Sequence, residues 1–85
     1  MNNDNNDNNN EYILTIHYIF PDGNKASESY SKNYVSGDLY KVYSPVINGY
    51  TSSKNVVSGV MPKRNVSITI IYSIKVYTLK INYKF

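Results

Sequence analysis

Apolar and polar side chains alternate along much of the chain, which is the pattern of β-strands. In an extended chain, alternate side chains point to one face. The period is clearest in "YILTIHYIF" (12–20) and "VSITIIY" (66–72), and each segment predicts a strand with one apolar face. The first face consists of Tyr12, Leu14, Ile16, Tyr18 and Phe20, and the second of Val66, Ile68, Ile70 and Tyr72. No stretch shows the 3.6-residue spacing of an amphipathic helix, so little helix is expected.

Turn residues divide the chain between these two strands. "PDGN" (21–24) combines a proline that presets φ with a glycine that tolerates positive φ, which predicts a second strand in "KASESYSKNYV" (25–35). Its Ala, Glu and Ser residues also permit a helix, but Tyr30 and Tyr34 carry the only strong apolar signal and favour a strand. A further short strand is predicted in "SKNVVSGV" (53–60). Breaks are expected at "SGD" (36–38), "NGYT" (48–51), "MPKRN" (61–65) and Pro45, which cannot donate to a ladder.

The last residues of the chain repeat the apolar face of the first strand. "VYTLKINYKF" (76–85) and "EYILTIHYIF" (11–20) agree only at alternate positions, which are Tyr12/Tyr77, Leu14/Leu79, Ile16/Ile81, Tyr18/Tyr83 and Phe20/Phe85. This spacing predicts a repeat period of 65 residues (77 − 12). Residues 11–75 then form one module, and residues 76–85 are the first strand of a following repeat or an added strand. Because "SIK" (73–75) contains no turn residue, the chain is expected to run nearly straight into the next repeat.

The charges of the chain are scattered. Its net charge is +3, and residues 11–85 carry nine basic and four acidic groups, or +5. Nucleic-acid binding requires a clustered basic stripe, and only Lys63 and Arg64 are adjacent, so no nucleic-acid partner is expected. Residues 1–10 hold seven Asn and two Asp, offer nothing for a core to bury, and are predicted to be a disordered tail. They also lack the Gly and the distal Glu of a calcium loop.

The sequence lacks the residue sets that catalysis or metal binding requires. The absence of Cys excludes disulfides, Cys-based zinc sites, iron–sulfur clusters and thiol catalysis. His17 is the only His, and one His with scattered carboxylates cannot assemble a zinc site or a catalytic triad. Roles in turns or on a polar strand suffice for Asp22, Glu28 and Asp38. We therefore expect no enzyme activity, no catalytic residues, no metal and no cofactor.

Export and membrane signals are not visible in the sequence. "MNNDNNDNNN" has neither the basic nor the apolar region of a signal peptide, and no apolar run approaches the roughly 18 residues of a membrane span. Either the protein stays inside the cell or the sequence is a piece of a longer secreted chain, and the partial second repeat favours the latter. Asn65-Val66-Ser67 fits the N-glycosylation pattern, but it abuts a predicted strand and chance explains it better.

Short motifs follow the predicted strands in a fixed order. They are Asp22-Gly23 after the first strand, Gly37-Asp38 before Tyr40, Ser44-Pro45 leading to Gly49-Tyr50-Thr51, and Ser58-Gly59 before Met61-Pro62. In this order and spacing, residues 12–72 resemble the MucBP (mucin-binding protein) type of repeat, which occurs in tandem in surface proteins of Gram-positive bacteria. The resemblance implies a mostly β module related to the ubiquitin-like β-grasp, with a mixed sheet of about four or five strands and a short or absent helix. It also implies an extracellular stalk at the bacterial cell surface, neighbouring repeats in the same chain, adhesion to mucin or other host glycans, and no catalysis.

The ten tyrosines of the chain have two explanations. AT-rich codons and a β-sheet core account for most of them, while aromatic faces also stack on sugars and partners. In the resembled pattern, core positions correspond to Tyr12, Tyr18, Tyr30, Tyr34, Tyr40, Tyr50 and Tyr72. Tyr43 falls where that pattern is usually small or polar, so it is the candidate ligand-binding residue.

Two classes of function stay open at this point. The first is a surface repeat that either adheres to a glycan or spaces an adhesive tip from the cell. The second is a small soluble or phage-encoded protein that uses a β-grasp face to bind another protein. An enzyme is the least supported class, since no acid, base, nucleophile or metal set can be assembled.

Overall fold

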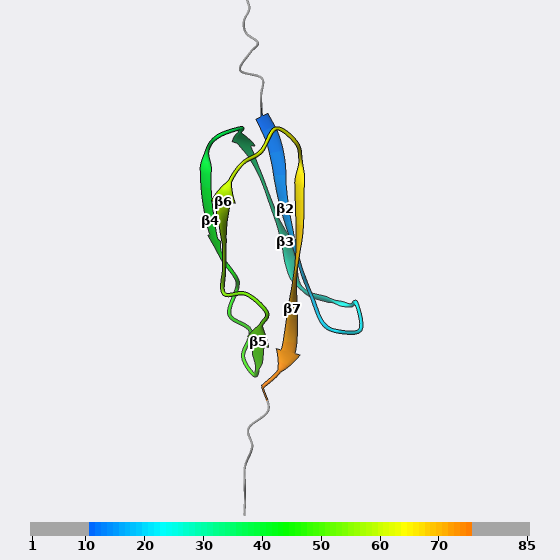
Figure 1. Cartoon of the computed structure of the whole chain (residues 1–85). Coiled ribbons are helices and arrows are strands. Elements are labelled where there is room, and N and C mark those ends of the chain that lie inside the picture. The colour runs from blue at the N-terminus through cyan, green and yellow to red at the C-terminus, as the bar shows by residue number, and fades with distance from the viewer. Residues whose placement is uncertain (1–10, 76–85) are drawn as a thin grey trace, which may run out of the picture.

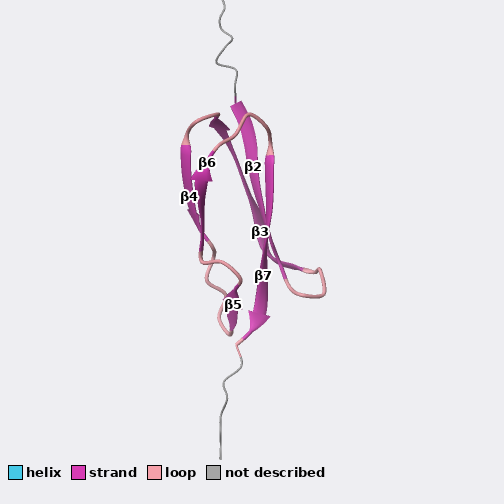
Figure 2. Ribbon diagram, in the orientation of Figure 1, coloured by secondary structure: helices cyan, strands magenta, loops and turns pink. Residues whose placement is uncertain are grey.

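The computed structural model describes residues 11–75. The predictions of a disordered tail at 1–10 and of a further strand at 76–85 lie outside the described residues. Residues 11–75 contain strands and turns but no helix, as the alternating pattern predicted (Figure 2). The strands are β2 (Glu11–Ile19), β3 (Lys25–Val35), β4 (Leu39–Tyr43), β5 (Tyr50–Ser52), β6 (Val56–Val60) and β7 (Val66–Ile74). The segment 25–35, for which a helix was also open, is a strand.

The strands form a four-stranded sheet and a separate two-stranded ribbon. The sheet has the order β3-β2-β7-β5, and the ribbon consists of β4 and β6. β2 is parallel to β7, whereas β3 and β5 are antiparallel to their neighbours, so the sheet is mixed. This confirms the small mixed β-fold. The relation to the ubiquitin-like β-grasp stays a prediction.

The parallel pairing of the first and last strands sets the path of the chain. Leu14 lies opposite Val66, and Ile19 lies opposite Ile71, so β2 and β7 run side by side in the same direction. The chain therefore enters the module at the end where β2 begins, and it leaves at the end where β7 finishes (Figure 1). We call these the N-terminal end and the C-terminal end of the module.

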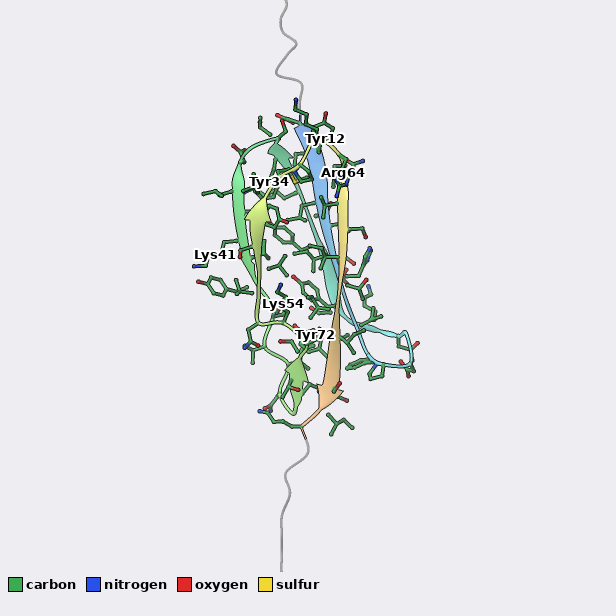
Figure 3. The ribbon with its side chains drawn as sticks, in the orientation of Figure 1. Tyr12, Tyr34, Lys41, Lys54, Arg64 and Tyr72 are labelled. Atoms are coloured by element: carbon green, nitrogen blue, oxygen red, sulfur yellow. The ribbon has the colours of Figure 1, made fainter. Side chains whose placement is uncertain are left out.

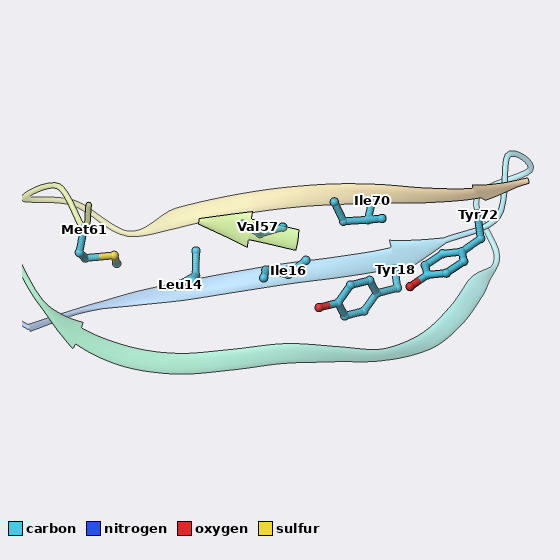
Figure 4. Packing of buried hydrophobic residues seen from close by; sticks show 7 residues of the cluster. All are labelled: Leu14, Ile16, Tyr18, Val57, Met61, Ile70 and Tyr72. Carbon is cyan, nitrogen blue, oxygen red and sulfur yellow. The ribbon is translucent and has the colours of Figure 1, made fainter. Parts of the chain in front are cut away.

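The core lies between the sheet and the ribbon. Its buried residues are Leu14, Ile16 and Tyr18 from β2, Ile70 and Tyr72 from β7, Val57 from β6, and Met61 (Figure 4). All of the buried β2 and β7 residues come from the alternate positions that the sequence predicted. The Tyr72 hydroxyl donates a hydrogen bond to the Pro45 carbonyl at 2.6 Å, so this polar atom of the core is satisfied.

The other face of the sheet is free of the ribbon and mainly polar. We call it the open face, and it carries Ile13, Thr15, His17, Ser67 and Thr69. Ile13 is 41% exposed, and Ser67 and Thr69 are exposed. His17 points away from the core, as its position in the alternation predicted, and its Nδ1 lies 3.2 Å from the hydroxyl of Ser29 on β3.

The turn between β2 and β3 is held by its own side chains. Gly23 adopts φ 95°, a conformation that L side chains rarely take, and its N–H donates to the Phe20 carbonyl at 2.8 Å. The Asp22 carboxylate accepts hydrogen bonds from the backbone N–H of Asn24 at 2.9 Å and from its side-chain amide at 3.0 Å. A similar contact joins the Asp38 carboxylate to the Val35 N–H at 3.1 Å. Both carboxylates thus have the turn roles expected from the sequence.

The core position of Leu14 leads to a test of the strand assignment. Leu14 has no exposed surface, whereas its neighbour Ile13 is 41% exposed on the open face. We expect Leu14→Ala to lower the free energy of unfolding by about 3 kcal/mol, because it removes buried methyl groups and leaves a cavity. Ile13→Ala is the matched control and is expected to cost less than about 1 kcal/mol. Urea denaturation measures both, and equal losses would contradict the observed faces.

The pair Tyr30 and Tyr34 leads to a test by pH. Their hydroxyl oxygens lie 2.8 Å apart, and burial, followed by the hydrogen bond and charge of Tyr34, raises the pKa of Tyr30 from 10.0 to about 12. Above pH 10 the unfolded chain releases this proton while the folded chain retains it. Stability is therefore expected to fall as the pH rises from 10 to 12. In Tyr30→Phe the slope of the unfolding free energy against pH should correspond to one proton fewer. Urea denaturation at a series of pH values measures this slope, and an unchanged slope would contradict the assignment.

Candidate functional site

The outward side of the β4–β6 ribbon presents an exposed set of side chains. Antiparallel pairing places Tyr40 opposite Gly59 and Val42 opposite Val57, and these residues face the core. The alternate residues face away from the sheet. We call them the ribbon face, and they are Leu39, Lys41, Tyr43, Val56, Ser58 and Val60. Because β4 begins at the turn after β3, Leu39 lies near the N-terminal end and Tyr43 closer to the C-terminal end.

Tyr43 differs from the other tyrosines of the described residues in its exposure. Its side chain is 68% exposed, whereas Tyr18 and Tyr72 are buried. Half-buried tyrosines that pack against the core are Tyr12, Tyr30, Tyr34, Tyr40 and Tyr50. The predicted separation of one available ring from the core tyrosines therefore matches the burial of residues 11–75. Whether Tyr43 binds a ligand is a separate question.

Lys41 stands beside this ring on the same strand. Its ammonium nitrogen lies 5.6 Å from the centroid of the Tyr43 ring, within the range of a cation–π contact. The lysine points away from the sheet (Figure 3). Much of the ring surface stays open to solvent, since Tyr43 is 68% exposed.

A shallow pocket of about 420 Å³ lies on the ribbon, and Lys41 is part of its lining. Its lining consists of Leu39, Tyr40, Lys41, Ser58, Gly59 and Val60. Leu39 is 78% exposed and Val60 is 57% exposed, so the lining is open and partly apolar. Gly59 lies tightly against the Tyr40 ring, since a Cβ at this position would come within 2.9 Å of the Tyr40 hydroxyl oxygen.

The ribbon face combines an aromatic ring with two hydrogen-bonding groups. A sugar can stack its C–H groups on such a ring, while the Lys41 ammonium and the Ser58 hydroxyl can donate hydrogen bonds to sugar oxygens. Within residues 11–75, no three His, Asp or Glu side chains come together in a way that could hold a metal ion. The ribbon face is thus an exposed surface that carries a ring, a cation and a hydroxyl side by side.

A second pocket lies at the C-terminal end of the module. It has a volume of about 440 Å³ and is lined by Phe20, Pro21, Asp22, Tyr50, Ser73 and Ile74. The rings of Phe20 and Tyr50 pack with centroids 5.0 Å apart, and Ile74 is 66% exposed. The Lys75 N–H donates to the Gly49 carbonyl at 2.9 Å, so the chain leaves the module beside this pocket.

Sequence reasoning identified Tyr43 but missed its surroundings. Lys41 lies two positions before Tyr43, and the alternation of β4 could have placed both on one side. Ser58 and Val60 could not have been added, because their position opposite Lys41 and Leu39 depends on the register of β6.

Asn65, part of the glycosylation pattern, has a structural contact, since its side-chain oxygen accepts a hydrogen bond from the Ile13 N–H at 2.8 Å. None of the described residues forms a helix able to cross a membrane.

Comparison with solved structures identifies the fold. The type 2 repeat of the mucus binding protein MUB from Lactobacillus reuteri has a TM-score of 0.66 and 21% sequence identity, and the match covers 76% of this chain and 49% of that one. A MucBP domain from Lactobacillus acidophilus has a TM-score of 0.58 and 24% identity, covering 76% and 91%. The mucin-binding domain of a Streptococcus pneumoniae protein has a TM-score of 0.62 and 13% identity, covering 76% and 90%.

These matches confirm, at the level of the fold, the resemblance read from the motifs. The chain has the fold of MucBP domains, and the matched part spans about half of the length of the MUB repeat. No family model and no curated protein sequence matches the chain.

Proposed function

We propose that residues 11–75 form a non-enzymatic adhesion module of a bacterial surface protein, which binds mucin or another host glycan through the ribbon face. The observation that carries this proposal is the exposed Tyr43 ring with Lys41 beside it, on a fold shared with domains named for mucin binding. Every other tyrosine of the described residues packs against the core or lies within it.

The physical case for a glycan rests on the composition of the ribbon face. An aromatic ring stacks on the apolar side of a sugar, and this contact needs no deep pocket. Lys41 and Ser58 supply donors for hydroxyl groups next to the ring. The pocket of about 420 Å³ is open and shallow, which suits a chain of sugars better than an enclosed small molecule.

The path of the chain supports display on an extended stalk. Because β2 and β7 are parallel, consecutive modules would join end to end, with each module adding length to a rod. This arrangement, together with the repeat at 76–85, supports an extracellular position at the cell surface with neighbouring repeats as partners. A module of this kind can also serve only as a spacer, and the experiment on Tyr43 separates the two roles.

The second candidate is a small soluble or phage-encoded module that binds a protein. The apolar side chains of the ribbon face, Leu39 and Val60, favour it, since exposed apolar residues also mark protein interfaces. The flanking genomic sequence distinguishes the two candidates. An upstream signal peptide and further 65-residue copies support the surface repeat, whereas start and stop codons at these ends support the protein-binding module.

Substitution of Tyr43 tests the adhesion site. We expect Tyr43→Ala to abolish saturable binding to immobilised mucin, and to change the free energy of unfolding by no more than about 0.5 kcal/mol, because the ring is exposed. Val46→Ala is the matched control, since Val46 is 96% exposed and lies outside the ribbon face; it should bind like the parent chain. A glycan array with the full chain reports the ligand. Saturable binding that survives Tyr43→Ala would exclude this site. If the unmodified chain does not bind at all, the adhesion role is excluded and the spacer role is supported.

The proposed module boundary is tested by adding or removing strands. Removal of residues 76–85 should leave the melting temperature nearly unchanged, because β2 and β7 already pair within residues 11–75. Residues 21–75 appended to the full chain should fold as a second module, with residues 76–85 taking the role of β2. The same addition to a chain that stops at Lys75 lacks this strand and should leave the appended residues unfolded. A large loss of stability on truncation would instead mean that residues 76–85 complete the first sheet.

A further inference from the structure

The repeat period of the sequence is an odd number of residues, and this has a consequence for the geometry of an array. In β2 the core residues are Leu14, Ile16 and Tyr18, all at even positions. Their counterparts 65 residues later are at odd positions, namely Leu79, Ile81 and Tyr83. The apolar side chains of the first strand are thus at even positions in this module and at odd positions in the following repeat.

The last strand of the module has the same parity as the first. The core residues of β7 are Ile70 and Tyr72, again at even positions. Side chains separated by an odd number of residues point to opposite sides of an extended chain. If β7 continued without a bulge into residues 76–85, its apolar side chains and those that begin at Tyr77 would point to opposite sides of one continuous strand.

The connection leaves little room for a change of direction. Ile74 is still within β7, and the Lys75 N–H donates to the Gly49 carbonyl, so the contact with the segment before β5 extends one residue past the strand. Only residues 75 and 76 separate Ile74 from Tyr77, and neither is Gly, Pro, Asn or Asp. A bulge or a turn has no favoured residue here.

We infer that the ribbons of two successive repeats lie on opposite sides of the strand that connects the repeats. This strand is β7 of the first repeat continued into the first strand of the second. The two ribbon faces therefore point away from each other. This inference rests on the proposed tandem arrangement. Strand twist adds a smaller rotation over the few residues of the junction.

Opposed ribbon faces determine how an array engages its ligand. Two neighbouring repeats could not lay both ribbon faces on one flat surface or along one glycan chain. They would instead hold separate glycan chains on the two sides of the rod, so that an array links chains within a mucin layer. Multivalent binding to one surface would then come from those repeats whose ribbon faces point to the same side.

Distances between labelled cysteines in a two-repeat chain test this arrangement. The chain consists of residues 1–85 followed by a second copy of residues 21–75, and because it has no Cys, introduced cysteines are the only labelling sites. Lys54→Cys marks the loop that leads into the ribbon strand β6 in the first repeat. In the second repeat, the copy of Leu39 marks the ribbon face near the N-terminal end, and the copy of Ser67 marks the open face there. Each second-repeat site is changed to Cys in turn, and electron spin resonance measures the distance to Lys54→Cys.

The order of the two distances is the readout. We expect the distance to the Ser67 copy to be shorter than the distance to the Leu39 copy. One serine inserted after Lys75 should reverse this order, and two serines should restore it, because only parity matters. If both repeats fold and the Leu39 copy is the nearer one, the inference is overturned. If the second repeat does not unfold cooperatively, the 65-residue period is wrong and the inference falls with it. Saturable glycan binding that survives Tyr43→Ala would exclude the adhesion site without changing these distances, so failure of the adhesion site is recognised separately.

Discussion

The parallel pairing of β2 with β7 is the interaction on which the rest of the structure depends. It joins the first and last strands of the module, and together they supply five of the seven buried core side chains. The other two, Val57 and Met61, come from the ribbon strand β6 and the residue after it, and they close the core against this pair. Parallel strands require a long connection, and here that connection supplies the edge strands and the ribbon.

The same pairing gives the module its direction. Because the two central strands point the same way, the chain enters the module at one end and leaves it at the opposite end. The ribbon is joined to this central pair by side-chain packing, and its outward side is free. Stability and proposed recognition are thus assigned to different residues, with Leu14 and Ile70 serving the first and Tyr43 and Lys41 the second.

Several features of the fold followed from the residues because their causes are local. The faces of β2 and β7 follow from the alternation around Ile16 and Ile70, and the β2–β3 turn follows from Pro21, Asp22 and Gly23. The exposure of Tyr43 was expected only through the resemblance to other repeats, since its own strand alternates unevenly. The pocket between Phe20 and Tyr50 was not anticipated, because these residues are 30 positions apart (50 − 20) and meet only through the pairing of β5 with β7.

The sequence by itself determined the strand periodicity, the turns, the absence of Cys and so of thiol chemistry, and the odd spacing of the repeated strand. Each of these depends on neighbouring residues or on simple counting. Only the tertiary structure decided that β2 and β7 lie parallel at the centre of one sheet, and that β4 and β6 leave it to form a separate ribbon. The register that places Ser58 opposite Lys41 was decided there too. Such pairings arise from contacts between distant segments that compete to bury the same apolar faces, and no local pattern selects among them.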